Sequence, residues 1–162
     1  MGATTYRLEL DANRHPTLVK ESEFSCYDKP ITEPAYIVEL CDKLVRLRFL
    51  AEENVIMVAV DTKGYILGIF KVSQGTIDMA TCTPRKIFIR ALLVGASRIF
   101  LVHNHPSGDC TPSKVDIECK ERIEEIGNMI GINLNDFIIV GMDSFENRNH
   151  LAAMHIAQAN PV

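Results

Sequence analysis

The sequence predicts an α/β sandwich in which helices flank a mixed central sheet. Two short apolar runs, at 55–60 and 98–102, are typical of buried strands. Prolines at 34 and 84 suit the first turn of a helix, and the first of these segments carries Ile37, Leu40 and Leu44 at helical spacing. From residue 55 onward the elements follow the order β-β-α-β-α-β, and this alternation is typical of the α/β class.

The elements can be placed in order along the chain. Period-two alternation at the N-terminus predicts an extended arm or hairpin within residues 1–30. A helix with Thr32 as its capping residue then precedes two strands, 55–60 and 65–72, joined by a turn at Asp61–Gly64. The remaining elements are a helix from 84 to about 96, a strand ending at His103, a helix from Ser113 to Gly127 or Gly131, and a strand at 137–140. We expect a main domain at 31–148 and a tail at 149–162.

Composition limits the classes of function. The chain has 162 residues, 47% hydrophobic and 23% charged, which suits one globular domain. Its formal charge of −4 does not support DNA binding, because nucleic-acid binders usually carry a basic excess. Five cysteines without a CxxC pair, and no secretion signal, predict a reduced cytoplasmic protein. No apolar run reaches the roughly 18 to 20 residues that cross a membrane.

A metal site is the chemistry that the motifs favour. His103 and His105 lie two apart, so in an extended segment both side chains point to one side. Two imidazoles and the carboxylate of Asp116 form a common zinc ligand set that leaves a fourth position for water. Each part also has a purely structural interpretation: two histidines at a polar strand end, and Ser113 with Asp116 as a capping box.

The complete string favours the metal interpretation. His103-x-His105-Pro106, followed by Ser113 and Asp116, resembles the motif of the JAMM (MPN+) metallopeptidases, and His-Asn-His-Pro-Ser-Gly-Asp at 103–109 resembles the RadC-type branch of that family. The resemblance extends through 72–76, 84–85 and 136–141 and covers roughly 35 to 145. It implies a cytidine-deaminase-like JAMM fold, a Zn²⁺ cofactor bound by His103, His105 and Asp116, and hydrolysis of a peptide or isopeptide bond.

The resemblance also implies two catalytic residues. The family has a glutamate general base near an upstream strand, and alignment places it at Glu53; Glu52 is the alternative, since only one of the two neighbours faces the site. Ser113 would donate a hydrogen bond to the developing oxyanion. Asp109 and Ser107 are expected to hold the imidazoles in one tautomer, and Asn104 to point away from the ligands.

Three departures from the family pattern stand out. Cys110 replaces a usual proline, and Phe137 replaces a usual histidine. The helix-hairpin-helix region that often precedes the domain in longer relatives is not predicted in the N-terminal stretch. Neither substituted position is a metal ligand in the family, so the predicted site stays complete.

Other functions remain as alternatives. A DNA-repair or nucleic-acid-processing role follows from the RadC association, and a non-catalytic interaction module is known among relatives that have lost their ligands. A barrel amidohydrolase would need about 250 residues. A cysteine enzyme would pair Cys110 with His105. We expect a protein or peptide substrate; its identity and the oligomeric state are open.

Overall fold

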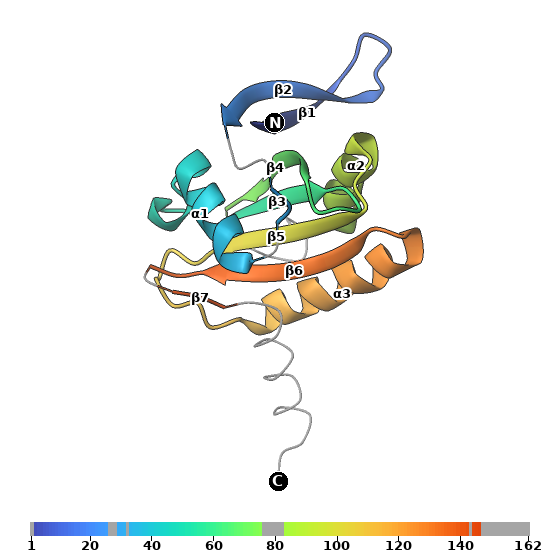
Figure 1. The fold of residues 1–162 in the computed structure, drawn as a ribbon. Helices are drawn as coiled ribbons and strands as arrows, with labels where there is room; N and C mark the ends of the chain where they lie inside the picture. Colours follow the sequence, from blue (N-terminus) through green and yellow to red (C-terminus); the bar gives the residue numbers. More distant parts are fainter. Residues whose placement is uncertain (1, 26–28, 32, 76–82, 143, 147–162) are drawn as a thin grey trace.

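A seven-stranded mixed sheet forms the centre of the molecule (Figure 1). The structure is a computed structural model that describes residues 2–25, 29–31, 33–75, 83–142 and 144–146. The strand order is β2-β1-β4-β3-β5-β6-β7. The strands are β1 (Gly2–Leu10), β2 (Pro16–Ser25), β3 (Asn54–Val60), β4 (Ile66–Gln74), β5 (Arg98–Asn104), β6 (Asn133–Val140) and β7 (Phe145–Glu146).

Strand direction determines where the connections run. β3 is antiparallel to both of its neighbours, β4 and β5, and the β3–β4 turn at Asp61–Gly64 is present as predicted. β5 and β6 are parallel, so the chain must cross the sheet between them, and helix α3 (Lys114–Ile130) makes that crossing. The loop that leaves β5 therefore leads directly into the start of α3.

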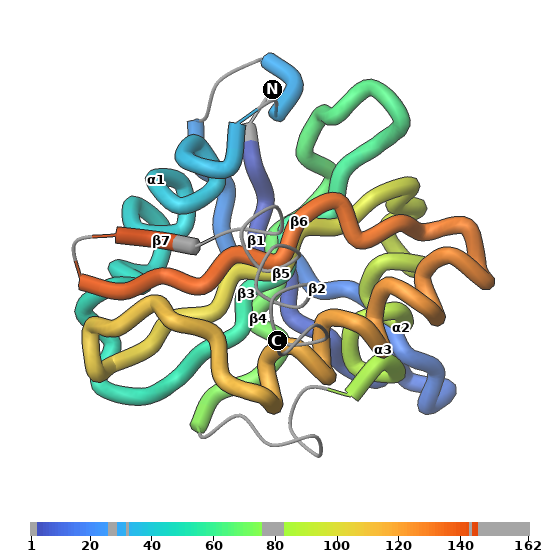
Figure 2. The backbone as a smooth tube through the Cα atoms, turned by 90° about the horizontal axis from the view of Figure 1, so that it is seen from below, coloured from blue at the N-terminus to red at the C-terminus, as the bar shows by residue number. Residues whose placement is uncertain are grey.

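Helices cover both faces of the sheet (Figure 2). α1 (Pro34–Val45) packs on one face, and a short 3-10 helix, η1 (Leu47–Phe49), follows it; α2 (Pro84–Val94) and α3 pack on the other. Alternate residues of β3 go to each side: Val55, Met57 and Ala59 to the α2–α3 side, and the residues between them to the α1 side. This double coverage explains why β3 is apolar from Val55 onward.

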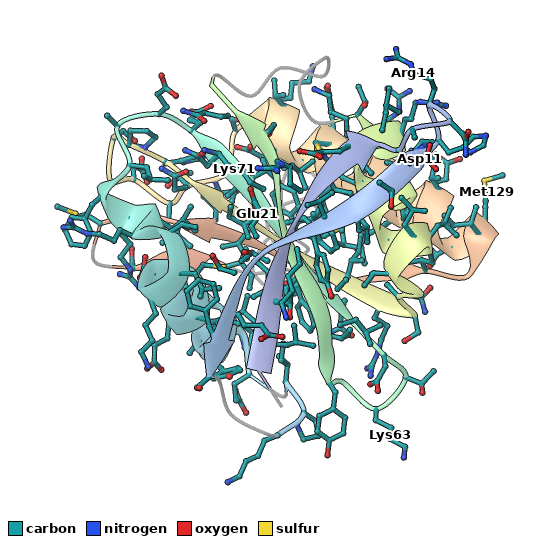
Figure 3. All side chains as sticks on the ribbon, turned by 90° about the horizontal axis from the view of Figure 1, so that it is seen from above. Asp11, Arg14, Glu21, Lys63, Lys71 and Met129 are labelled. Atoms are coloured by element: carbon teal, nitrogen blue, oxygen red, sulfur yellow. The ribbon has the colours of Figure 1, made fainter. Side chains whose placement is uncertain are left out.

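The N-terminal hairpin continues the same sheet. β1 pairs antiparallel with β2 and parallel with β4, and the Tyr6 ring stacks on Phe70 of β4 with 5.7 Å between centroids. Figure 3 shows the hairpin crossing over the molecule, with Asp11 and Arg14 at its tip. Asp11 Oδ1 closes this tip by accepting hydrogen bonds from the backbone N–H groups of Asn13 and His15, both at 2.8 Å.

The observed element boundaries differ from the predicted ones at several points. β6 begins at Asn133, four residues earlier than predicted. The prediction missed this start because the first half of the strand alternates exposed polar and buried residues and lacks an apolar run. α3 continues through Gly127 and ends at Gly131, and the short strand β7 was not predicted. Thr32 lies outside the described residues; Glu33 is the N-cap of α1. Among the described residues, no helix has both the length and the apolarity that crossing a bilayer requires.

Candidate metal centre

The end of β5 positions the two histidines. His103 pairs with Val55 of β3 and Ile139 of β6, and its side chain is 1% exposed. The backbone N–H of His105 donates to the Val140 carbonyl at 2.9 Å, so the extended path continues past the last residue of β5. The two rings meet edge to face with 4.6 Å between centroids. Both imidazoles therefore lie on the same side of the sheet.

Asp116 reaches the histidines from the first turn of α3. Ser113 is the N-cap: its hydroxyl accepts a hydrogen bond from the Asp116 backbone N–H at 3.2 Å, and Asp116 Oδ2 accepts one from the Ser113 backbone N–H at 2.7 Å. These two bonds make a complete capping box. The Asp116 side chain is 2% exposed and lies against both imidazoles. The capping box and the candidate ligand set thus share one carboxylate.

The space between the three side chains suits a small cation. His103 Nε2 lies 3.5 Å from Asp116 Oδ1, and His105 Nε2 lies 3.5 Å from Asp116 Oδ2. All ligand atoms of the cluster fall within 4.8 Å of one another. Zinc bonds of about 2.0 to 2.1 Å in a tetrahedron place neighbouring ligand atoms about 3.3 to 3.4 Å apart. The two histidine–aspartate separations therefore suit a zinc ion.

Backbone carbonyls hold the far side of each imidazole. His105 Nδ1 lies 2.7 Å from the Asp109 carbonyl oxygen, and His103 Nδ1 lies 3.4 Å from the Asn54 carbonyl oxygen. A carbonyl only accepts hydrogen bonds, so in these contacts Nδ1 carries a hydrogen. When the ring is neutral, the lone pair is then on Nε2, which faces Asp116; when His105 is protonated, its Nε2 donates to Asp116 instead. The neutral ring is in the tautomer that metal binding needs.

Burial and charge act differently on the three groups. Burial lowers the pKa of His103 below its usual value, although the Asp116 carboxylate opposes this. The hydrogen bond to Asp116 raises the pKa of the more exposed His105. Burial opposes ionisation of Asp116, but hydrogen bonds from His105 and Ser113 outweigh it and hold the pKa of Asp116 below its usual value. Asp116 is therefore a carboxylate ready to bind a cation.

A carboxylate that is not a candidate ligand lines the same cavity. The cavity has a volume of about 160 Å³ and is lined by Glu53, His103, His105, Ser107, Ser113 and Asp116. Glu53 is half-buried and precedes β3 by one residue. The neighbouring Glu52 is exposed, and its Oε2 accepts a hydrogen bond from Gln74 Nε2 at 2.5 Å. Of the two glutamates considered as general base, Glu53 is therefore the one at the cavity.

The loop after β5 differs in detail from the expectation. Asp109 does hold His105, but through its backbone carbonyl; its carboxylate accepts a hydrogen bond from the Thr111 backbone N–H at 2.9 Å. The Ser107 hydroxyl accepts a hydrogen bond from the Asp109 backbone N–H at 3.3 Å, so it supports the loop, while the residue also lines the cavity. The Ser113 hydroxyl donates to Asp116 Oδ2 at 2.6 Å.

A second hollow adjoins the cavity. It has a volume of about 330 Å³ and shares His105 and Ser107 with the cavity of the cluster. Its outer wall includes the side chains of Phe49, 63% exposed, and Met142, 52% exposed. The cavity of the cluster therefore adjoins a partly apolar hollow.

Comparison with known proteins shows the family of this chain. The profile of the family described as "RadC-like JAB domain" matches residues 31–150, which is most of the chain. The chain belongs to the RadC-like JAB domain family. The match begins after the β1–β2 hairpin and includes all three residues of the cluster. It also agrees with the mixed α/β sheet and its flanking helices.

Curated relatives share the same region of this RadC-like chain. A UPF0758 protein of Clostridium tetani is 40% identical over 114 residues, which are 68% of this chain and 48% of the relative. A UPF0758 protein of Caldanaerobacter subterraneus is 38% identical over 111 residues, or 68% and 47%. One of Clostridium beijerinckii is 39% identical over 118 residues, or 73% and 51%. The chain thus spans about half the length of the curated relatives it matches.

Two departures from the RadC pattern lie outside the ligand set. Phe137 is 1% exposed in the core under α2 and α3. Cys110 Sγ lies 3.1 Å from Ser144 Oγ, and the Nδ1 atom of His105 is engaged with the Asp109 carbonyl. The Cys110 thiol therefore has a hydroxyl rather than an imidazole as its neighbour, which argues against the cysteine-enzyme alternative.

Sequence reasoning missed two residues that support this RadC-like site, Asn54 and Gly141, and the contacts of a third, Asn104. The Asn54 carbonyl faces His103, the Asn104 side chain contacts the segment that carries Glu53, and Gly141 packs against the loop after β5. For Asn104 the period-two alternation predicted the correct side of the sheet but not its contacts. Gly141 follows a run of apolar residues directly, and a glycine at a strand end is a signal for close backbone approach.

Proposed function

We propose that this RadC-like domain is a zinc-dependent metallohydrolase that cleaves a peptide or isopeptide bond. The observation that carries the proposal is the orientation of the two imidazoles. Both turn Nε2 toward Asp116 and are held at Nδ1 by backbone carbonyls, so three ligands converge on one ion-sized space. Zinc, when bound there, supplies Lewis acidity: it acidifies water and polarises a carbonyl group.

Glu53 would move the proton. A hydrolase needs a group that takes a proton from the attacking water and returns it to the leaving amine. Glu53 lines the cavity of the cluster and does not belong to the ligand set. A carboxylate in this place can accept the proton on the water side and release it on the side of the leaving group.

Ser113 would stabilise the charge that develops on the carbonyl oxygen. Its hydroxyl lies at the cavity and donates to Asp116 Oδ2 in the described structure. Rotation of the O–H bond would redirect the same hydrogen toward an oxyanion without moving the helix. The role therefore requires only a change of hydroxyl orientation, because the Ser113 oxygen is already fixed by the capping box.

The hollow beside the cavity supports a polypeptide substrate. It continues from His105 and Ser107 to Phe49 and Met142, and so offers room for residues on one side of the scissile bond. Backbone amides and apolar side chains of an extended peptide suit such a surface. A protein or peptide substrate is therefore proposed.

The first experiment measures metal content. Wild type, His103→Ala and His15→Ala are purified without a polyhistidine tag, incubated with zinc, desalted and analysed for bound metal. His15 is the matched control because its side chain is 75% exposed in the N-terminal hairpin. We expect about one zinc per chain in the wild type and in His15→Ala, and a loss of bound zinc in His103→Ala.

The same measurement of metal content can also contradict the proposal. Absence of bound zinc from the wild type after incubation would leave the histidines as a structural strand end and would favour a non-catalytic interaction module. Zinc in the wild type justifies a screen of peptide and isopeptide substrates, with a chelator-treated sample as the blank.

A further inference from the structure

Asn104 lies between the two histidines in the sequence but on the other face of the sheet. It is the last residue of β5, and its side chain is 1% exposed. Strand alternation sends His103 to the side of α3 and Asn104 to the side of α1. Asn104 therefore cannot act on a substrate in the cavity directly.

The Asn104 amide is hydrogen-bonded to the backbone of another segment. Its Oδ1 accepts from the Asn54 backbone N–H at 2.7 Å. Its Nδ2 donates to the Glu52 carbonyl at 3.1 Å and lies 3.5 Å from the Leu50 carbonyl. One buried side chain thus contacts three backbone groups within residues 50–54.

These contacts begin where the sheet ladder stops. The register between β3 and β5 ends at the pair Val55–His103, and residues 50–53 precede β3. The side chain of Asn104 extends the pairing of β5 beyond that point. Asn54 Nδ2 adds a second hydrogen bond to the Glu52 carbonyl, at 2.8 Å. The backbone on both sides of Glu53 is therefore fixed by amide groups.

Two groups of the candidate site depend on this segment. Glu53 lies between the two residues that Asn104 holds, and its side chain lines the cavity. The Asn54 carbonyl faces His103 Nδ1. A shift of this backbone would move a carboxylate over the cavity, and misplacement of a reacting group by about 1 Å can cost about 100-fold in rate.

We propose that Asn104 is a positioning residue that holds Glu53 over the metal cavity from the opposite face of the sheet. The inference rests on the proposed function, because it assigns Glu53 the role of the general base. Asn104 acts through the backbone of residues 52–54 and touches neither substrate nor metal.

The test is a double-mutant cycle on zinc-loaded protein. We expect Asn104→Ala to lower kcat about 10- to 100-fold, to leave KM within about twofold, and to retain bound zinc. In a Glu53→Gln background the same substitution should cost less than about threefold, since the group that it positions is already inactive. Equal losses of kcat in the two backgrounds would overturn the proposal.

A control separates positioning from general destabilisation. Val102 is buried on the same strand and the same face, two residues before Asn104. Val102→Ala should lower the melting temperature but leave kcat near the wild-type value at 25 °C. If Asn104→Ala does not fold, Asn104→Asp replaces it: this side chain keeps the acceptor for Asn54 but, when ionised, has no N–H for the Glu52 carbonyl, and should also lower kcat.

Hydrogen exchange makes the inference testable apart from activity. In metal-free protein, the Asn54 amide hydrogen should exchange slowly in wild type and at least tenfold faster in Asn104→Ala, while core amides of β3 stay protected. Unchanged protection of Asn54 would overturn the positioning role. A wild type that binds no zinc or cleaves no substrate would instead reject the proposed function, and the exchange result would still decide whether Asn104 fixes the segment.

Discussion

Two neighbouring glutamates show how one step along the chain separates a surface charge from a candidate catalytic group. Glu52 is exposed and accepts a hydrogen bond from Gln74, whereas Glu53 lines the cavity beside His103 and His105. Their backbone is held by the same asparagine. The pair therefore offers a substitution and a matched control that have the same chemistry.

Glu53→Gln should retain zinc and lower kcat by about 100- to 10,000-fold, because an amide cannot accept the proton from the attacking water. Glu52→Gln should keep both zinc and turnover. Metal content and steady-state kinetics on one substrate measure this prediction. Equal activity of the two variants would show that Glu53 is not the base.

Ser113→Ala should have two separable effects. Loss of the N-cap costs about 0.5 to 2 kcal/mol of stability. Loss of an oxyanion donor costs about 100- to 1,000-fold in kcat, while zinc remains bound through the three ligand side chains. Thermal melting, metal content and kinetics separate these effects. A lower melting temperature with unchanged kcat would show that Ser113 acts only as a helix cap.

The described cysteines should differ sharply in reactivity. Burial raises the pKa of Cys41 to about 12, so its thiol stays protonated and enclosed at pH 8; Cys110 is partly exposed. Iodoacetamide at pH 8 should modify Cys110 in the native protein and Cys41 only after unfolding, as measured by peptide mass spectrometry. Alkylation at Cys110 that abolishes zinc-independent hydrolysis would revive the cysteine-enzyme alternative.

At the scale of elements, the loop between His105 and α3 depends on the residue that follows β6. A Cβ atom on Gly141 would lie 2.2 Å from the Gly108 carbonyl oxygen and 3.2 Å from the Cys110 backbone nitrogen. Gly108 itself has a φ of +85°, which favours glycine. The loop that joins His105 to α3 is thus packed backbone to backbone against the strand beside it.

Gly141→Ala should displace this loop and weaken zinc binding about tenfold or more, in addition to a loss of stability of about 1 to 3 kcal/mol. Gly127→Ala is the control, since its Cβ would meet the Ile132 carbonyl oxygen at 2.4 Å in the turn after α3. Both variants should have a lower melting temperature than the wild type. Only Gly141→Ala should bind zinc more weakly than the wild type in a competition titration. The same zinc affinity in both would contradict a role for Gly141 in the site.

Most elements could be predicted because their residues carry local signals. Proline in the first turn located α1 and α2, and the apolar run located β3. β7 has only two residues and forms by pairing with β6, so it has no pattern of its own. The early start of β6 was missed because Asn133 and Asn135 face solvent in alternation with buried residues, and short alternation resembles a loop.

At the scale of the whole molecule, the candidate site joins segments that the fold brings together from separate elements. His103 and His105 come from β5 and its extension, Asp116 from α3, and Glu53 from the segment before β3. A ligand that binds the folded protein and not the unfolded chain stabilises the fold by mass action. Zinc should therefore stabilise the entire domain.

Zinc at about 100 times its dissociation constant should stabilise the protein by about 2.7 kcal/mol, which corresponds to a rise of about 5 to 10 °C in melting temperature for a chain of this size. Chelation should reverse the shift, and His103→Ala should show none. Differential scanning calorimetry with and without zinc gives the measurement. A wild type whose melting is insensitive to zinc and chelator would count against a folded-state zinc site.

The cluster of His103, His105 and Asp116 could be predicted from the sequence, whereas the residues that support it could not. A fixed string links His103, His105, Ser113 and Asp116 within fourteen positions, so their approach is largely local. The contacts of Asn104 with residues 50–54 span about fifty positions and depend on where the β3–β5 ladder ends. That end is a property of the assembled sheet, and no residue pattern specifies it.

The capping box of α3 limits how this domain can vary. Ser113 and Asp116 start the helix and at the same time face the histidines, so a single turn carries both a folding signal and a candidate ligand. Aspartate is ordinarily as good an N-cap as serine. At position 113 it would place a second negative charge against Asp116 and remove the hydroxyl, so a routine stabilising exchange would disturb the candidate metal cavity. Engineering for thermostability should therefore leave this turn alone and begin at the exposed C-terminal end of the helix, where Met129 is 79% exposed.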